Sequence, residues 1–243
     1  MDTTKTHEEW LREMEEKSRA KQKTFIGGIS SKLRRPMVDD APPHPFRGSP
    51  DFWNAYEWNE QERINRFTDN FVSVGGHVQR LETMEEVRGF ITDKANELSA
   101  KYIVRQNEPE LAGLNLEDEL PDARISVWNT DPEQHWKARS AEADIGVVMV
   151  DYAAAYTSSM VVLSSKDKGR SVSLLPTVLI AIIPVERIKT RLGEVMVQFD
   201  ESGRANLPAG IHFISGPSRS SDIENDLTIG VHGPGVVYAL IVG

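Results

Sequence analysis

The stretch Val178-Leu179-Ile180-Ala181-Ile182-Ile183 decides the fold class of this chain. An unbroken apolar run of this length, rich in β-branched side chains, is typical of a strand covered on both faces. Five further apolar runs follow residue 143, at positions 144–150, 160–163, 211–214, 227–231 and 236–242. Strands buried on both faces occur in parallel sheets that pack between helices. The second half of the chain therefore predicts a largely parallel sheet.

Helices alternate with short strands in the segment before these runs. Thr83 and Glu86 have the spacing of a capping box, which predicts a helix from there to about residue 101. Short strands are expected at positions 71–74, 102–104 and 123–128, and Asp131 is expected to cap the next helix. We therefore expect a three-layer α/β fold, with a mostly parallel sheet between helices on both faces. The short link 232–235 predicts that the last strand returns antiparallel to the run before it.

The amino-terminal segment differs in composition from the rest. Thr6 and Glu9 also have capping-box spacing and predict a helix over residues 7–23, which either rests solvated on the domain or docks a partner. Residues 34–58 hold five prolines, which exclude a continuous helix. They also hold five aromatic residues: Phe46, Phe52, Trp53, Tyr56 and Trp58. This segment either wraps the core or forms a lid or partner surface. We expect a helical and extended segment over 1–59 and an α/β domain over 60–243.

Composition excludes several classes of protein. The 243 residues include 28 Lys plus Arg and 37 Asp plus Glu, and the resulting charge of −9 disfavours binding to nucleic acid or to a membrane surface. Because cysteine is absent, disulfides, a thiol nucleophile and thiolate-held metals are excluded. The six histidines lack metal-ligand spacing, so no metal is expected. No signal peptide pattern or apolar run of roughly 18 residues occurs, which predicts a cytoplasmic protein without a membrane span.

The first candidate binding loop spans residues 215–224. Its candidate ligand-binding residues are Gly216, Pro217, Ser218, Asp222 and Glu224. Glycine allows a ligand to approach the backbone, and a helix beginning near residue 221 would direct free N–H groups toward an anion. The same spacing also fits a capping box, in which Glu224 merely satisfies a backbone N–H group.

Two further segments could belong to the same site. Loop 230–235 carries His232 and Gly233, and the imidazole is either structural or a proton-transfer group oriented by Asp222 or Glu224. The turn 166–171 has three cations, and its Arg170 and Ser171 could hold a phosphate or carboxylate unless the turn is simply solvated. No Walker A or dinucleotide-binding glycine motif occurs. These patterns assign no catalytic residue.

The motifs of the second half resemble those of the lactate-utilisation (LUD) domain family. The matching stretches are 143–146, 169–171, 173–176, 182–188, 215–218, 222–224 and 230–234. The most specific feature is the spacing from Gly216-Pro217-Ser218 to His232-Gly233-Pro234. The likeness is firm over residues 70–243 and looser before them. Chain length, the absence of cysteine and the proline-rich connector resemble the C-type members of the family.

This resemblance carries expectations about fold and function. It implies a fold related to the sugar-phosphate isomerase and CoA-transferase group and to formyltetrahydrofolate cyclo-ligase. It also implies a component of the system that oxidises L-lactate to pyruvate, with iron–sulfur clusters held by partner proteins A and B and no cofactor on this chain. The family commonly has an acidic residue and a Ser/Thr-Gly-Thr stretch where this chain has residues 156–159, Tyr-Thr-Ser-Ser. A carboxylate nucleophile is therefore not expected there.

Two other functions stay open at this point. A free-standing ligase or acyl-transfer enzyme would use Lys168, Arg170 and the glycine-containing loop to bind a phosphate- or CoA-bearing ligand. A regulatory or scaffold protein would use its loops and aromatic segment to bind protein alone.

Overall fold

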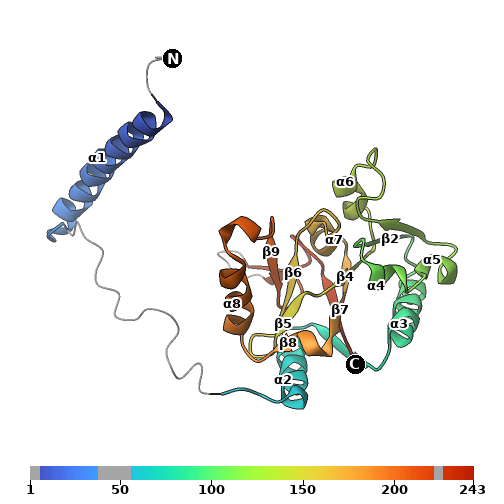
Figure 1. Ribbon diagram of the computed structural model, residues 1–243. Helices are drawn as coiled ribbons and strands as arrows, with labels where there is room; N and C mark the ends of the chain where they lie inside the picture. Colours follow the sequence, from blue (N-terminus) through green and yellow to red (C-terminus); the bar gives the residue numbers. More distant parts are fainter. Residues whose placement is uncertain (1–5, 38–55, 222–226) are drawn as a thin grey trace. The chain divides into compact units, whose positions relative to one another are not determined.

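The computed structural model describes residues 6–37, 56–221 and 227–243 (Figure 1). The chain divides into two compact units, residues 1–55 and 56–243, and each is described by itself. The helices and strands of the second unit are, in chain order, α2 (Glu60–Ser73), β1 (His77–Leu81), α3 (Met84–Glu97), β2 (Tyr102–Arg105), α4 (Pro109–Ala112), α5 (Leu116–Glu119), β3 (Arg124–Val127), α6 (Trp136–Ala141), β4 (Ile145–Met149), β5 (Tyr152–Ala154), β6 (Ser159–Leu163), α7 (Arg170–Leu174), β7 (Val178–Pro184), β8 (Ile188–Lys189), α8 (Leu192–Ser202), β9 (Ile211–Ile214), β10 (Arg219–Ser221), β11 (Leu227–Ile229) and β12 (Val236–Val242).

A parallel sheet forms the centre of this unit. Its six strands lie in the order β1-β12-β7-β4-β2-β3, and every neighbouring pair is parallel. All of β4 is buried, as is β7 from Val178 to Ile183. The expected α/β fold with a mostly parallel sheet is therefore confirmed, and its middle strands are those with the most continuous apolar runs.

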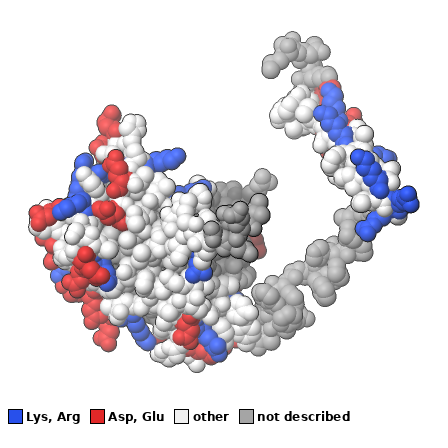
Figure 2. All heavy atoms as spheres, turned by 180° about the vertical axis from the view of Figure 1, so that it is seen from behind, with Lys and Arg blue, Asp and Glu red and all other residues white. Residues whose placement is uncertain are grey.

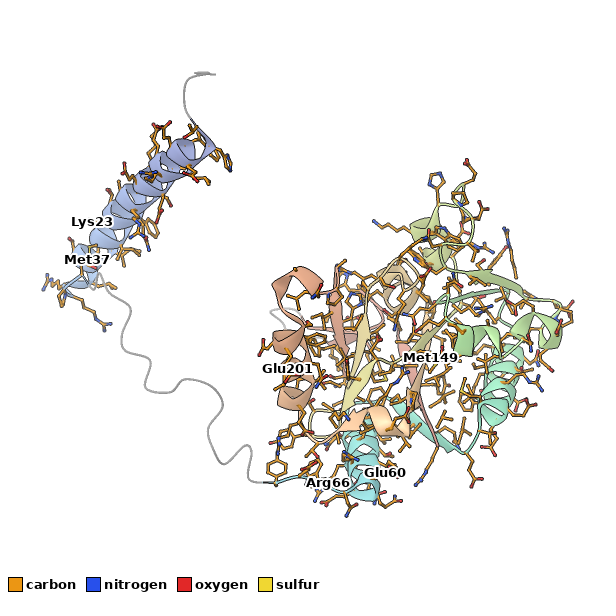
Figure 3. The ribbon with its side chains drawn as sticks, in the orientation of Figure 1. Lys23, Met37, Glu60, Arg66, Met149 and Glu201 are labelled. Atoms are coloured by element: carbon orange, nitrogen blue, oxygen red, sulfur yellow. The ribbon has the colours of Figure 1, made fainter. Side chains whose placement is uncertain are left out.

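Both faces of the central sheet are covered. Helices α3, α4 and α5 pack on one face, where Ile91 and Leu111 join Ile145 and Ile180 in one core. The other face packs against α2, α7 and a second, four-stranded sheet of order β8-β5-β6-β9, with Phe67 among the buried residues. Helix α8 covers the outside of that second sheet (Figure 1). Figure 3 shows Met149 of β4 inside the domain, where it is fully enclosed.

The prediction of a strand at residues 71–74 is wrong. Phe71 lies in α2, which extends to Ser73. Ile64, Phe67 and Phe71 follow one another at helical spacing and are all buried, so this longer pattern outweighs the local β propensity. The helix ends where the Gly75 N–H donates to Val72 O and the Gly76 N–H donates to Phe71 O.

The helix cap expected at Asp131 is also wrong. Helix α6 begins five residues later at Trp136 and has no side-chain cap. Asp131 instead accepts a hydrogen bond from the Glu133 N–H (2.9 Å) within a turn, and its carbonyl accepts one from the Trp136 indole (3.0 Å). The Asp-Pro pair thus stabilises a turn here, as these residues also do outside helices. The helix expected from Thr83 is confirmed, since the Thr83 hydroxyl accepts a hydrogen bond from the Glu86 N–H.

The antiparallel return expected at the end of the chain is wrong. Strand β12 lies between β1 and β7 and is parallel to both. Strand β11 belongs to a separate two-stranded hairpin with β10, and all three of its residues are exposed. The link 232–235 therefore joins a hairpin to the central sheet instead of joining two strands of one sheet. The apolar run 227–231 predicted a strand buried on both faces, but β11 is exposed.

The described part of the first unit is helix α1 (His7–Leu33). Thr6 and Glu9 form the expected capping box, but the helix continues ten residues beyond its expected end, because Gly27 and Gly28 cost only about 1 kcal/mol each. It ends where Arg34 adopts a left-handed conformation with φ 53°. Residues 17–35 hold seven Lys or Arg and no Asp or Glu, and basic side chains gather along the helix in Figure 2.

No residue of α1 is buried. Within residues 6–37, 56–221 and 227–243, no helix is long and apolar enough to cross a membrane. Phe46, Phe52 and Trp53 of the aromatic segment lie outside the described residues, whereas Trp58 packs against the core of the second unit.

Candidate functional site

The two glycine-containing loops meet in the structure. The Ser218 N–H donates to Pro234 O (2.9 Å), and the Gly230 N–H donates to Ser218 O (3.0 Å). Gly233 lies against Ser218 so closely that an added Cβ would be 3.1 Å from Ser218 Cβ. The two loops are therefore joined by backbone hydrogen bonds, although Pro234 follows Ser218 by sixteen positions in the sequence.

The second of these loops borders a hollow of about 510 Å³, which we call the His232 hollow. Its lining residues are Leu174, Leu175, Pro176, Thr177, Ile229, Gly230, Val231, His232, Gly233 and Gly235. Thr177 and Gly235 directly precede β7 and β12, and the Gly235 N–H donates to Thr177 O (3.0 Å). The hollow therefore lies at the amino-terminal edge of the parallel sheet, although ligands of open α/β sheets usually bind at the opposite edge.

The 215–219 loop is anchored on its other side to the end of α2. Gly216 has φ +110°, and an added Cβ would lie 3.0 Å from Val74 Cγ2. The Arg219 guanidinium donates to Val74 O. Ser215 shares a hydrogen bond of 2.8 Å with the buried Ser159 hydroxyl of β6. These contacts anchor the loop to the end of α2 and to β6.

Two of the expected site residues, Asp222 and Glu224, lie outside the described residues, and so does any contact with His232. The prediction of a helix that begins near residue 221 is wrong at this residue, because Ser221 is the last residue of β10 and pairs with Leu227. His232 itself is exposed. Its neighbours Leu227, Ile229 and Val231 are also exposed, each by more than half of its surface. Exposed apolar side chains therefore lie on and beside the rim of the hollow.

The structure places Arg170 and Ser171 elsewhere, in a neighbouring cavity of about 480 Å³ that we call the Trp128 cavity. Its lining residues are Trp128, Lys137, Ser164, Ser165, Lys168, Gly169, Arg170, Ser171, Leu174, Leu175 and Ala209. The two hollows share Leu174 and Leu175. Of the expected site residues, His232 and Gly233 line the first hollow and Arg170 and Ser171 line the second, whereas residues 216–218 line neither.

The turn that precedes Arg170 is not simply solvated. Lys168 is buried, and its Nζ lies 2.6 Å from Asp151 Oδ1 and 3.2 Å from Glu108 Oε1. Burial raises the pKa of the Glu108 carboxyl, and the Lys168 ammonium acts against this rise. Asp151 Oδ2 also accepts the Leu163 N–H (2.8 Å). Of the cations in this turn, Lys168 is already neutralised by protein carboxylates.

Our sequence reasoning missed Glu108 and Asp151, although a signal for them existed. Asp151 follows β4 by two residues and Glu108 follows β2 by three, and these two strands are neighbours in the sheet. Acidic residues after adjacent parallel strands meet at the carboxyl edge of the sheet. Among the loops that follow strands, 215–224 and 230–235 stand out in the sequence by their glycines and polar residues, whereas Glu108 and Asp151 carry no such motif.

A histidine not singled out by its sequence lies near the Trp128 cavity. His212 Nε2 is 3.4 Å from Ser164 Oγ, and Ser164 lines the cavity. Burial and, second, the Arg170 guanidinium lower the pKa of His212. Within the described ranges, no group of three or more His, Cys, Asp or Glu residues could hold a metal ion.

Comparison with known proteins gives consistent matches. A model of the LUD domain matches residues 64–242. Lactate utilization protein C of Halalkalibacterium halodurans is 31% identical over 217 residues, which cover 88% of this chain and 94% of that protein. Lactate utilization protein C of Bacillus subtilis is 27% identical over 223 residues, covering 88% and 92%. The Bacillus licheniformis protein of the same name is 42% identical over 135 residues, covering 54% and 55%.

The fold also matches a solved structure. The crystal structure of a DUF162 family protein from Deinococcus radiodurans superposes with a TM-score of 0.55 and 18% identity, covering 76% of this chain and 99% of that one. At this identity the likeness concerns the fold alone.

Proposed function

This chain belongs to the LUD domain family, and from that premise we propose that it takes part in lactate utilisation, as a component of the system that oxidises L-lactate to pyruvate. The observation that carries the proposal is the match to lactate utilization protein C of Halalkalibacterium halodurans over 88% of this chain and 94% of that protein. The LUD domain match over residues 64–242 includes the loop of the His232 hollow as well as the central sheet. A shared fold alone would be weaker support, since one fold serves many functions.

The proposal assigns the redox centres to partner proteins in the cytoplasm. Cysteine-held iron–sulfur clusters require thiolate ligands, and this chain has no cysteine. Such clusters therefore do not fit this chain, and we assign them to iron–sulfur lactate-utilisation proteins A and B.

The His232 hollow is our candidate for the functional surface of this component. Its backbone is fixed by the Ser218–Pro234 and Gly235–Thr177 hydrogen bonds, and its rim exposes Ile229 and Val231. A preformed hollow with an imidazole suits a small anion, and an exposed apolar rim suits a protein partner. We propose that the partner docks over this rim and closes the hollow.

Growth on lactate tests the role of this surface. A strain lacking the gene is complemented with the wild-type chain, with His232→Ala, or with His135→Ala as a control on an exposed histidine near α6. We expect His232→Ala to lose growth on L-lactate but keep growth on pyruvate, and His135→Ala to grow normally on both. Normal growth of the His232→Ala strain on lactate would overturn the assignment of the hollow.

A pull-down tests the assembly itself. The tagged full-length chain is purified without oxygen from lactate-grown cells, and the eluate is assayed for iron and for lactate-dependent dye reduction. Iron together with lactate oxidation supports the proposal. An iron-free, inactive protein contradicts it and favours the second candidate, a free-standing ligase or acyl-transfer enzyme, for which Arg170 in the Trp128 cavity supplies a cation for a phosphate.

A further inference from the structure

The Trp128 cavity is too large and too apolar for lactate. Its volume is about 480 Å³, and Trp128, Leu174, Leu175 and Ala209 supply apolar surface to its walls. Cavities of roughly 300–1,000 Å³ enclose ligands of cofactor or drug size. Lactate has few heavy atoms and would leave most of this apolar lining exposed to water. The cavity therefore suits a ligand with a substantial apolar part.

Trp128 provides a fixed aromatic surface in this cavity. Its Nε1 donates to Lys166 O (3.1 Å), and its ring lies so close to Gly169 that a Cβ added there would overlap the indole. The Trp136 ring packs beside it, with centroids 5.6 Å apart. An indole held on several sides loses little further conformational freedom when a flat ring stacks on it. The shape of the site thus favours a planar aromatic group.

The turn that carries this indole contact is itself held in place. The Asn107 N–H donates to Asp167 O (2.9 Å), and the Asn129 side chain donates to Lys166 O (3.2 Å). The ion pairs of Lys168 with Asp151 and Glu108 tie the same turn to the carboxyl edge of the sheet. Such support from neighbouring residues is characteristic of preorganised binding sites.

Two cations border the cavity, Lys137 on α6 and Arg170 at the start of α7. Within the described part of the chain, neither forms an ion pair with a carboxylate. Asp151 and Glu108 are already paired with Lys168, and the Asp167 carboxylate of the turn accepts a hydrogen bond from the Asn107 side chain (3.4 Å). The guanidinium fork of Arg170 matches the oxygen geometry of phosphate and carboxylate groups.

We propose that the Trp128 cavity binds a small molecule in which a planar aromatic ring carries a phosphate or carboxylate group. The ring stacks on Trp128 beside Leu174 and Leu175, and the anionic group binds Arg170 and Lys137. This inference stands apart from the proposed role in lactate utilisation, because it is tested by binding to the purified chain without lactate. Failure of one proposal therefore leaves the other intact.

Isothermal titration of the purified full-length chain tests the ligand class. The probes are AMP and FMN, and adenosine and riboflavin serve as the same rings without phosphate. We expect at least one phosphate-bearing probe to bind with a Kd below about 1 mM, and its phosphate-free counterpart to bind at least about tenfold more weakly. No binding of either phosphate probe at about 10 mM, or equal affinity with and without phosphate, overturns the proposal.

Variants locate the binding within the cavity. Arg170→Gln is expected to weaken binding of the phosphate-bearing probe about tenfold, so that its Kd approaches that of the phosphate-free counterpart. Arg124→Gln, which removes the same charge from an exposed side chain of β3, is the matched control and should bind like the wild type. Unchanged affinity in Arg170→Gln would place the binding elsewhere and overturn the assignment.

A second pair of variants tests the aromatic surface. Trp128→Phe keeps an aromatic ring and is expected to retain most of the affinity. Trp128→Leu should weaken binding of the phosphate-bearing and the phosphate-free probes by the same factor. Thermal unfolding of each variant shows whether the fold is retained. If Trp128→Leu unfolds, the comparison of Trp128→Phe with the wild type and the Arg170→Gln titration still decide the proposal. Full affinity in a folded Trp128→Leu variant would contradict stacking.

Discussion

Lys168 and Asp151 form an ion pair of 2.6 Å that joins the turn after β6 to the end of β4. The Lys168 side chain is only 10% exposed, and Glu108 approaches the same ammonium at 3.2 Å. One buried cation therefore compensates two carboxylates at the carboxyl edge of the sheet. Because the turn also supports Trp128 and Arg170, this ion pair links the stability of the fold to the shape of the Trp128 cavity.

Lys168→Met should destabilise the protein strongly. The variant leaves Asp151 and Glu108 close together without a cation, and breaking a buried ion pair in this way costs about 3 kcal/mol. We expect the free energy of unfolding in urea to fall by roughly this amount at neutral pH. Lys166→Met, which removes an exposed lysine from the same turn, should change it by less than about 0.5 kcal/mol.

The loss in Lys168→Met should also depend on pH. Burial and the neighbouring Asp151 charge raise the pKa of Glu108, and removal of the ammonium leaves these effects unopposed. A folded state that holds this proton to higher pH than the unfolded state loses stability as pH rises. The destabilisation should therefore be larger at about pH 8 than at about pH 5. Equal losses at both values would show that the carboxylates are solvated in the variant.

His212 should contribute to loss of stability in acid. Burial and the Arg170 charge lower its pKa below the ordinary value of 6.5. As pH falls below that value, the unfolded state binds a proton before the folded state does, so the free energy of unfolding decreases. We expect His212→Gln to show a smaller decrease than the wild type in urea unfolding between about pH 7 and pH 5. The exposed control His135→Gln should keep the wild-type slope; an unchanged slope in His212→Gln would contradict the argument.

Gly169→Ala should disturb the Trp128 surface. An added Cβ would overlap the indole, and overpacking of this kind costs about 1–3 kcal/mol. Gly89 in α3 is the control, since nothing lies within 4 Å of a Cβ added there. Gly89→Ala should stabilise the helix by about 0.5–1 kcal/mol. Urea unfolding followed by tryptophan fluorescence should show opposite shifts of the midpoint, and a stable Gly169→Ala variant would mean that Trp128 can move freely.

The sequence predicted the parts of the fold whose patterns depend on local physics. Val178–Ile183 is apolar throughout because β7 is covered on both faces, and Thr83 caps a helix through a contact within one turn. The exposed strand β11 shows where such patterns fail. Leu227 and Ile229 are 57% and 53% exposed, although their run resembles a buried strand. An apolar run does not specify which sheet it joins or what covers it.

The candidate site was predictable to a similar extent. Gly216–Ser218 and His232–Pro234 were proposed as one site, and the structure brings these loops together. Arg170 was a candidate from a third segment, the turn 166–171, and it lies in the adjacent Trp128 cavity. That division depends on how α7 packs against β4 at Gly146, where an added Cβ would overlap Val172 O and crowd Pro176. A contact between an element and a distant strand leaves no local signature in the sequence.

Gly216→Ala should impair function more than stability. Gly216 has φ +110°, which costs a residue with a side chain about 1–3 kcal/mol, and an added Cβ would press on Val74. The loop can relieve both effects by shifting, and this would break the Ser218–Pro234 hydrogen bond that shapes the His232 hollow. We expect faster hydrogen exchange at the Ser218 amide, a modest fall in the midpoint of thermal unfolding and loss of growth on L-lactate.

Gly203→Ala is the matched control for this prediction. Gly203 also has a positive φ, +73°, but nothing lies within 4 Å of an added Cβ. The Gly203→Ala substitution therefore introduces backbone strain without displacing the loops around His232. The variant should lose a similar amount of stability and should still grow on lactate. If both variants grow equally well, the conformation of the 215–218 loop is not required for function. If both fail, reduced stability alone explains the loss, and the specific role of the hollow is contradicted.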